Sequence, residues 1–350
     1  MRRPLHLLAL LLLVAFSLAI TACGSDDDEE PSGSSSGGTA QEEPAKAVKV
    51  GLVTDIGGLN DRSFNQLANE GLERSKSELG ADTRVLISNK NSDYVPNLST
   101  LAQQKYDLVI AVGFLMAEAV ETVAGKFPDT KFAVIDVSAE GMKSKPSNVA
   151  GLLFKEAEAG YLAGYVAALY AKDEGADTIS SVGGEKIPPV DAYIAGYQAG
   201  AKEAFPEIKT LNGYSQDFVD QAKCKELGLN QIAEGSVVVF QVAGQCGLGA
   251  LDAAKEKNVQ GIGVDADQGY LGEHILTSAQ KKVDVAVETA IKSVQDDSFE
   301  GGKDVIFDLN NDGVGLGALG PAGTKYEDQA NEIIEKIKSG EITDIPTTVE

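Results

Sequence analysis

The chain is poor in the residues that hydrolytic triads and metal sites use. Its 350 residues include two histidines, three cysteines and no tryptophan. His6 lies in an apolar N-terminal segment, so only His274 remains for the rest of the chain. A Ser-His-Asp triad or a histidine-rich metal site would rest on that one residue, and one histidine with two cysteines does not complete a tetrahedral zinc site. We therefore expect a protein that is not an enzyme and that has no metal and no cofactor.

Basic residues are also scarce. The chain has 30 Lys and Arg against 53 Asp and Glu, which gives a formal net charge of −23 at pH 7. Nucleic-acid binding depends largely on Lys and Arg that neutralise phosphates. This charge therefore excludes a nucleic-acid partner and favours a ligand that is neutral, zwitterionic or cationic. Beyond the N-terminal segment, no stretch approaches the about 18 uninterrupted apolar residues that indicate a membrane-spanning helix.

The N-terminal segment has the pattern of an export signal. Arg2 and Arg3 precede a mostly apolar stretch from Leu5 to Ile20, which is shorter than the about 20 residues that span a bilayer. The run Ile20–Cys23 (Ile-Thr-Ala-Cys) resembles the bacterial lipobox. It predicts a signal peptide over residues 1–22 and a lipid on Cys23 that holds the protein at the extracytoplasmic face of a cell membrane. The alternative is an ordinary signal peptide followed by a chance cysteine.

Residues 23–46 have the composition of a tether. The acidic run Asp26–Glu30 is followed by Pro31–Gly38, which is almost entirely Ser and Gly. Such a composition cannot bury a hydrophobic core, so we expect a flexible connection between Cys23 and a folded region.

The remaining residues, about 300 of them, alternate short apolar runs with longer helical patterns, and they are enough for two domains. Alternation of this kind predicts an α/β fold with parallel sheets flanked by helices. The expected strands are 48–54, 84–88, 107–112, 131–137, 178–182, 210–214, 236–242 and 260–264. The expected helices include 64–79, 117–127, 160–171, 190–204, 219–234, 247–257 and 281–294.

Two sheets fit this count, with a break near Gly151 to Glu156. We expect an N-terminal lobe of residues 47–153 plus about 266–300, and a C-terminal lobe of residues 154–265 plus about 301–350.

Ligands of open parallel sheets bind at the carboxyl ends of the strands. The loop after the first expected strand contains Asp55, Asn60 and Asp61, and its helix starts near Phe64. Later loops contain Asp136, Phe218, Gly244, Asp265 and Lys281. Acids, amides, two aromatic rings and one lysine therefore recur where strands end, as expected for a pocket that binds a polar ligand with a ring.

Several of these loops together resemble one family, the basic membrane protein family of bacterial lipoproteins. Its members are substrate-binding components of ABC transporters and include purine nucleoside receptors. The resemblance runs from about Lys49 to Leu319. The motifs that carry it are Gly57–Asn65, Gly160–Gly164, Ala243–Gly249, Gly263–Gln268, and Leu276–Ser278 with Lys281.

The resemblance implies a type I periplasmic-binding-protein fold, in which a ligand is held between two lobes that close about a hinge. It also implies a base clamped between two aromatic rings and a ribose held by carboxylates and a lysine. The matching positions are Phe64 and Phe218 for the base, Asp265 and Lys281 for the sugar, and Asp136 for an acid of the first lobe. Further candidates for the base edge and the near loop are Asp55, Asn60, Asp61 and Asn65.

Each assignment has a plain structural alternative. Either phenylalanine could belong to the core, Asp61 could only cap a helix, and Lys281 could cap the helix expected after it. The predicted function is that of a monomeric receptor that captures a nucleoside, a purine nucleoside by preference, and delivers it to an ABC permease and its ATPase. The alternatives are a sugar, a flavin or a signalling molecule as the ligand, or a sensor that engages a signalling receptor.

Cys224 and Cys246 are an even pair in a protein expected to be exported to an oxidising compartment. Cys224 is early in an expected helix, and Cys246 is in the loop after the next strand, so both could lie at one sheet edge. We predict a disulfide that braces the loop from Gly244 to Gly247. The alternative is two free thiols that are buried separately.

Overall fold

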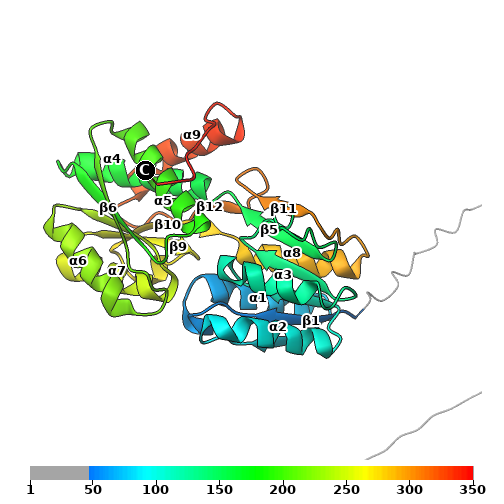
Figure 1. Cartoon of the computed structure of the whole chain (residues 1–350). Helices are drawn as coiled ribbons and strands as arrows, with labels where there is room; N and C mark the ends of the chain where they lie inside the picture. The colour runs from blue at the N-terminus through cyan, green and yellow to red at the C-terminus, as the bar shows by residue number, and fades with distance from the viewer. Residues whose placement is uncertain (1–46, 350) are drawn as a thin grey trace, which may run out of the picture. The chain divides into compact units, whose positions relative to one another are not determined.

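The computed structural model describes residues 47–349, which form two lobes, each built round one six-stranded sheet (Figure 1). The predicted signal peptide of residues 1–22, the predicted lipid site Cys23 and the predicted tether up to residue 46 lie outside the described residues. Among residues 47–349, no helix is long and apolar enough to cross a membrane.

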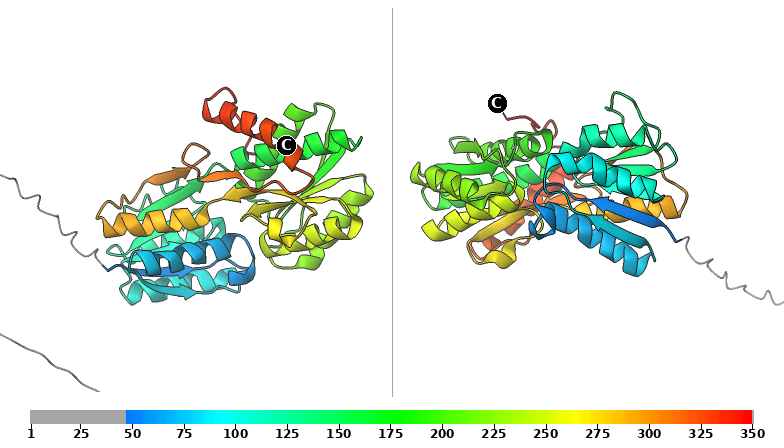
Figure 2. Two further views of the ribbon diagram at one scale, coloured as in Figure 1. Left: turned by 180° about the vertical axis from the view of Figure 1, so that it is seen from behind. Right: turned by 60° about the horizontal axis from the view of Figure 1, so that its bottom comes forward.

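The first lobe contains a parallel sheet in the strand order β11-β5-β4-β3-β1-β2. Its strands are β1 (Lys49–Val53), β2 (Asp82–Leu86), β3 (Leu108–Ala111), β4 (Lys131–Ile135), β5 (Val149–Phe154) and β11 (Asp304–Phe307). Its helices are α1 (Phe64–Glu78), α2 (Tyr94–Gln103), α3 (Ala117–Ala124) and α8 (Val283–Gln295). Figure 2 shows α1 and α8 packed side by side, and the apolar strand β3 is buried along its whole length, as is usual in parallel sheets covered on both faces.

The second lobe repeats this arrangement in the order β12-β10-β9-β8-β6-β7, with only β12 antiparallel. Its strands are β6 (Thr178–Gly183), β7 (Lys209–Tyr214), β8 (Val238–Val242), β9 (Gln260–Asp265), β10 (Ile275–Lys281) and β12 (Val314–Leu316). Its helices are α4 (Glu156–Asp173), α5 (Pro188–Ala204), α6 (Gln221–Ala233), α7 (Gly244–Lys257) and α9 (Glu327–Lys338). The predicted fold class, two lobes of mostly parallel strands flanked by helices, is confirmed.

Two late strands lie in other lobes than the sequence predicted. Residues 266–300 were expected in the first lobe, but β10 pairs with β9 of the second. Residues 301–350 were expected in the second lobe, but β11 pairs with β5 of the first. Within residues 47–349, the chain crosses between lobes three times, after β5, after β10 and after β11. An apolar pattern identifies a strand but not the sheet that the strand joins, so these short passages could not be assigned from the sequence.

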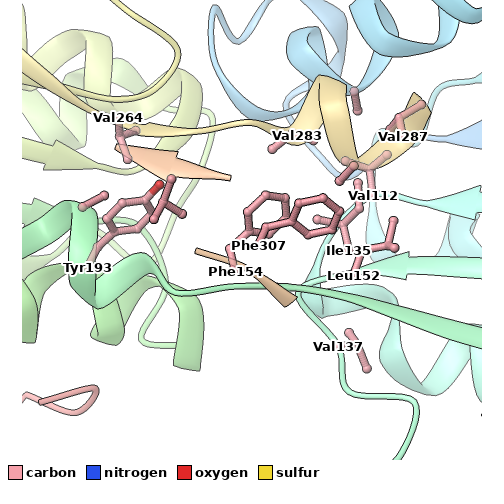
Figure 3. Packing of buried hydrophobic residues seen from close by; sticks show 14 of the residues in the cluster. Val112, Ile135, Val137, Leu152, Phe154, Tyr193, Val264, Val283, Val287 and Phe307 are labelled. Atoms are coloured by element: carbon pink, nitrogen blue, oxygen red, sulfur yellow. The ribbon is translucent and has the colours of Figure 1, made fainter. Parts of the chain in front are cut away.

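Two aromatic rings meet where the crossovers leave the first lobe. Phe154 and Phe307 are the last residues of β5 and β11, and their rings stack with centroids 4.9 Å apart (Figure 3). A pair of this kind contributes about 0.5–1.5 kcal/mol beyond the area it buries. The hydrophobic core around it continues into the second lobe, where it includes Tyr193 and Val264. The carboxyl ends of both sheets are therefore joined by packed, buried side chains.

Glycines bring α4 and α5 unusually close. A Cβ atom on Gly160 would lie 2.1 Å from the carbonyl oxygen of Tyr193, and one on Gly164 would lie 1.9 Å from that of Tyr197. On the facing helix, Gly200 is equally tight against α4. Only glycine leaves room for this approach of two backbones. The Gly160–Gly164 motif thus sets the position of α5, which carries Tyr193 toward the crossovers.

Candidate ligand site

A cavity lies at the carboxyl ends of both sheets and encloses about 610 Å³ of empty space, including its opening to solvent. Residues from both lobes line it. Nine of the ten predicted ligand residues are among them, namely Asp55, Asp61, Phe64, Asn65, Asp136, Phe218, Gly244, Asp265 and Lys281. Parallel sheets place the carboxyl ends of their strands along one edge, so residues far apart in the sequence meet here.

Asn60 is the exception among the predicted residues. It ends the short 3-10 helix η1 (Gly58–Asn60), and its side chain is exposed. It lines a separate groove together with Arg62 and Tyr270. Gly57, which precedes η1, has a left-handed backbone with φ of 107°, a conformation that favours glycine.

Asp61 and Asn65 hold the start of α1 in place. The Asp61 carboxylate accepts hydrogen bonds from the backbone N–H groups of Asn65 (2.7 Å), Gln66 (3.1 Å) and Ser63 (3.1 Å). The Asn65 side chain donates to Asp61 (3.0 Å) and accepts from the N–H of Asp55 (2.8 Å). The predicted helix-capping role of Asp61 is thus present in the structure, and its carboxylate also forms part of the cavity wall.

Asp55 follows β1 and is held on one side only. Its Oδ1 atom accepts hydrogen bonds from the N–H of Ile56 (2.7 Å) and from the hydroxyl of Tyr94 on α2. Its Oδ2 atom faces Gly113, where a Cβ would lie only 2.7 Å away. Burial raises the pKa of Asp55 to about 7, although the bonds from Tyr94 and Ile56 oppose the rise. Near neutral pH this carboxyl group can therefore either donate or accept a hydrogen bond.

Lys281 is the buried cation of the site. It is the last residue of β10, not the start of a helix, and its side chain is 2 % exposed. Its Nζ atom lies 2.6 Å from Asp136 Oδ1 and 2.9 Å from Glu156 Oε1. The same atom lies 4.8 Å from the centre of the Phe154 ring and 5.2 Å from that of Phe64. Lys281 therefore joins the second lobe, through β10, to an acid and two rings of the first.

Asp265 is the last residue of β9, the strand that pairs with β10, and it lies beside Lys281. Its Oδ2 accepts a hydrogen bond from the hydroxyl of Ser63 (2.5 Å), and its Oδ1 accepts one from the hydroxyl of Tyr193 (3.3 Å). Asp265 and Asp136 both have left-handed backbones, with φ of 60° and 67°. This conformation is uncommon outside glycine but is tolerated by aspartate. It turns the chain sharply where each strand ends.

The buried acids around Lys281 outnumber the available positive charge. Burial raises the pKa of Asp136, and it raises the pKa of Glu156 to about 7 and that of Asp265 to about 6, although Lys281 opposes each rise. Burial disfavours the charged form of Lys281, but the three carboxylates outweigh that effect and raise its pKa above the usual value. The cavity is therefore rich in hydrogen-bond acceptors, some of them protonated near pH 7, and it suits hydroxyl and N–H donors of a ligand.

Two phenylalanines come to the cavity from different lobes. Phe64 is the first residue of α1, and Phe218 lies in the loop between β7 and α6. Both are only partly buried. Each ring is seated against a glycine, because a Cβ on Gly113 would lie 3.2 Å from Phe64 and one on Gly184 would lie 2.3 Å from Phe218. Each ring thus packs against main chain and borders the cavity.

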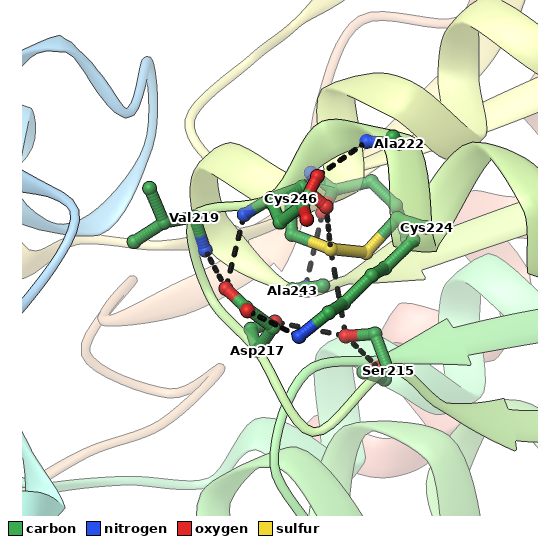
Figure 4. The surroundings of a disulfide bond; sticks show 11 residues. Ser215, Asp217, Val219, Ala222, Cys224, Ala243 and Cys246 are labelled. Atoms are coloured by element: carbon green, nitrogen blue, oxygen red, sulfur yellow. Dashed lines mark hydrogen bonds and ion pairs between the residues drawn. A yellow bond between two sulfur atoms is a disulfide. The ribbon is translucent and has the colours of Figure 1, made fainter.

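A disulfide joins Cys224 and Cys246 in the structure, with their Cα atoms 5.5 Å apart (Figure 4). The two cysteines lie in the first turns of α6 and α7. The N–H of Cys246 donates to the carbonyl of Phe218 (3.0 Å), so the disulfide, Gly244 and the Phe218 loop form one connected unit.

Sequence reasoning missed the residues that support the predicted ones. Glu156, Tyr193, Ser63 and Tyr94 all bind predicted site residues. Tyr193, Ser63 and Tyr94 do not follow an expected strand, and Glu156 follows β5, which was not among the expected strands. Glu156 gave one usable signal, because it is an acid just after an apolar run at the expected break between lobes. The others lie on helices or a loop whose contacts form only in three dimensions.

Comparison with known proteins gives a consistent result. The family model described as ABC transporter substrate-binding protein PnrA-like (Bmp) matches residues 47–347. The ABC transporter nucleoside-binding protein BmpA of Lactococcus lactis is 34% identical over 318 residues, which cover 85% of this chain and 88% of that protein. An uncharacterized lipoprotein of Pyrococcus abyssi is 38% identical over 289 residues, covering 79% of this chain and 70% of the relative.

Solved structures agree in fold. A solute-binding protein of an ABC transporter system from Aeropyrum pernix superposes with a TM-score of 0.77 at 29% identity, covering 85% of this chain and 94% of that chain. A second protein of the same description, from Conexibacter woesei, gives 0.68 at 26% identity and covers 87% of this chain and 100% of that chain.

Proposed function

Because the chain belongs to the PnrA-like (Bmp) family of ABC transporter substrate-binding proteins, as its motifs predicted, we propose that it captures a nucleoside between its lobes for delivery to an ABC permease. One observation carries this proposal. Phe64 and Phe218, from different lobes, line a single cavity with carboxylates and one buried lysine. The relative from Lactococcus lactis named as nucleoside-binding supports the same choice of ligand.

In this proposal the two rings hold the base. Phe64 and Phe218 each present one partly exposed ring to the cavity. Stacking of a base on an aromatic side chain contributes about 1–3 kcal/mol and requires no particular base. Because the rings belong to different lobes, a base bound between them draws the lobes together.

The carboxylates hold the sugar. Asp265, Asp136 and Lys281 form the most polar part of the cavity, and their charges are shielded from solvent. Hydroxyl groups of a ribose would donate to the two acids and accept from the lysine. A ligand without these hydroxyls would leave buried charges without partners, which is how such sites gain selectivity. Asp55 is the proposed partner of the base edge. Its Oδ2 atom lies next to Gly113, and both residues line the cavity.

Calorimetry tests the proposed ligand. The chain from Pro44 to Glu350 forms one compact unit and is suitable for titration with nucleosides, free bases, sugars and flavins. We expect saturable heat with nucleosides and none with sugars or flavins at the same concentrations. Heat with a sugar or a flavin and none with any nucleoside would overturn the proposal.

We further propose that the protein is a monomeric receptor and that a lipid on Cys23 anchors it at the extracytoplasmic face of the cell membrane. Relatives named as lipoproteins support this location. Cys23→Ala should move the protein from the membrane fraction to the soluble fraction and leave the affinity for nucleosides unchanged, because the cavity lies within residues 47–349. A Cys23→Ala protein that stays with the membrane would contradict the anchor.

A further inference from the structure

A chain of buried hydrogen bonds crosses from the second lobe to the first beside the cavity. The N–H of Ala243 donates to Gln241 Oε1 (3.1 Å), and Gln241 Nε2 donates to Gln268 Oε1 (2.8 Å). Gln268 Nε2 then donates to the carbonyl oxygen of Arg62 (3.1 Å). Both glutamines are 0 % exposed. We call this series the Gln241–Gln268 relay.

The second lobe fixes the position of Gln268. Its Oε1 also accepts a hydrogen bond from the N–H of Val264 (3.2 Å), and its own N–H donates to the hydroxyl of Ser278 (3.0 Å). Gln241 lies on β8, Val264 on β9 and Ser278 on β10, so three neighbouring strands hold this one residue, two of them through its side chain. The bond to Arg62 is the member of this set that leaves the second lobe.

Both ends of the relay adjoin residues that line the cavity. Ala243 immediately precedes Gly244 and Gln245, which line the cavity from the second lobe. Arg62 lies between Asp61 and Phe64, which line it from the first. A second bond supports the same crossing, since Ser63 donates to Asp265. The loop that carries Phe64 is thus tied to the second lobe at two adjacent residues.

Two glycines of the family motifs make room for the relay. A Cβ on Gly247 would lie 1.7 Å from Gln241 Oε1. A Cβ on Gly263 would lie 2.7 Å from Gln268 Oε1 and 2.6 Å from the hydroxyl of Ser278. The relay therefore explains why glycine occupies these two motif positions, which the ligand contacts do not explain.

We propose that Gln268 is a positioning residue that holds the two lobes closed and sets the Asp61–Asn65 loop against the ligand. Hydrogen bonds within one lobe stabilise that lobe whether the cleft is open or closed. The bond to Arg62 exists only while the lobes are together, so it shifts the equilibrium toward the closed form. A carboxamide is required here because one end must accept from Gln241 while the other donates to Arg62.

The variant Gln268→Glu separates the two halves of this role. A glutamate keeps the oxygen that accepts from Gln241 and Val264, but it sets a second oxygen against the carbonyl of Arg62. When ionised it repels that carbonyl, and when protonated it can donate to it. Burial raises the pKa of a glutamate, so the variant should pass from protonated to ionised between pH 6 and pH 9.

The expected results are measured on the Pro44–Glu350 unit by small-angle X-ray scattering without ligand and by calorimetry with adenosine, guanosine and inosine. At pH 9 the variant should have a larger radius of gyration than the unsubstituted protein and should bind the nucleosides about tenfold more weakly. At pH 6 both differences should largely disappear. The comparison is made at equal pH because Asp265, which binds the same loop through Ser63, has a pKa of about 6.

Gln231→Glu is the matched control. Gln231 is also buried and donates to a backbone carbonyl, that of Ser181 (2.8 Å), but both residues belong to the second lobe. This variant should lose thermal stability without a pH-dependent change in radius of gyration or affinity. The inference is overturned if Gln268→Glu matches the unsubstituted protein at pH 9, or if Gln231→Glu shows the same changes.

Side-chain amide exchange and scattering without ligand also test the role of Gln268. If Gln268→Glu does not fold, hydrogen exchange of side-chain amide protons in the unsubstituted protein tests the role of Gln268. Opening of the lobes should expose the Nε2 protons of Gln268 but not those of Gln231. Equal exchange at the two residues would refute the role. The inference relies on the proposed nucleoside only as a probe. If no nucleoside binds the unsubstituted protein, the proposed ligand is wrong, while scattering without ligand still tests Gln268.

Discussion

Replacing Lys281 by methionine should destabilise the fold in a way that depends on pH. The lysine side chain is 2 % exposed and lies within 2.9 Å of two carboxylates, Asp136 and Glu156, that are themselves 6 % and 8 % exposed. Methionine has a similar length and no charge, so it fills the space and leaves the acids without their cation. Removal of one partner from a buried ion pair costs about 3–5 kcal/mol.

The sign of the pH dependence follows from the acids. Burial already raises the folded-state pKa of Glu156 to about 7, and loss of the attractive lysine must raise it further. An acid whose pKa is higher in the folded state binds more protons there, so stability falls as pH rises from the unfolded value through the folded one. Each additional unit of pKa corresponds to about 1.4 kcal/mol. The Lys281→Met loss should therefore be close to the full 3–5 kcal/mol at pH 8 and smaller by about 1–3 kcal/mol at pH 5.5.

Urea unfolding followed by circular dichroism measures this difference, since the chain has no tryptophan to report by fluorescence. Lys282→Met is the matched control. It removes the same charge one residue away. There the ammonium group donates to the side-chain oxygen of Gln280 (3.2 Å), in a site that is partly buried. We expect a loss below about 1 kcal/mol for the control. A Lys281→Met loss that is equal at both pH values, or no greater than that of Lys282→Met, would refute the reasoning.

Three other outcomes are expected. Phe64→Ala and Phe218→Ala should each weaken nucleoside binding by about 1–3 kcal/mol in calorimetry, and unchanged affinity would remove both rings from the proposed site. Reduction of Cys224–Cys246, checked by mass spectrometry, should weaken binding because Cys246 holds the Phe218 loop; equal affinity before and after reduction would contradict this. Gly164→Ala, whose Cβ would lie 1.9 Å from a carbonyl oxygen, should lower the free energy of unfolding by about 1–3 kcal/mol in urea titration, and an unchanged midpoint would count against the tight α4–α5 packing.

The sequence predicts most strands of this fold but not where the late ones belong. β1, β3, β4 and β8 are short apolar runs with clear boundaries, and both β1 and β3 lie close to the predicted ranges. β5 was missed because the expected break between lobes was placed inside it. β10 and β11 were not among the expected strands. The sheet that β11 joins depends on its pairing with β5, which lies more than a hundred residues earlier in the chain. Local patterns contain no information about such partners.

The candidate site divides in the same way. Asp55, Asp136 and Asp265 could be predicted because each lies at the carboxyl end of a strand or within two residues of it, and parallel strands end at one edge. Glu156 was missed because β5, the strand that it follows, was not among the expected strands. Tyr193 was missed because it lies within α5, away from any strand end. Lys281 was predicted in the site but assigned to the wrong element, since a strand that ends in polar residues before a helix reads like a helix start.

The two lobes place equivalent acids in the cavity and differ in one neighbouring residue. β4 and β9 occupy the same position in their sheets. Asp136, just after β4, and Asp265, the last residue of β9, have nearly the same left-handed backbone. The next strands outward are also equivalent, but β10 ends in Lys281 whereas β5 ends in Phe154. A pair of acids alone would present similar acceptors to either end of a ligand. Lys281 of the second lobe and the ring of Phe154 in the first remove that symmetry. A ligand with hydroxyls at one end and a flat ring at the other would therefore fit in one orientation only.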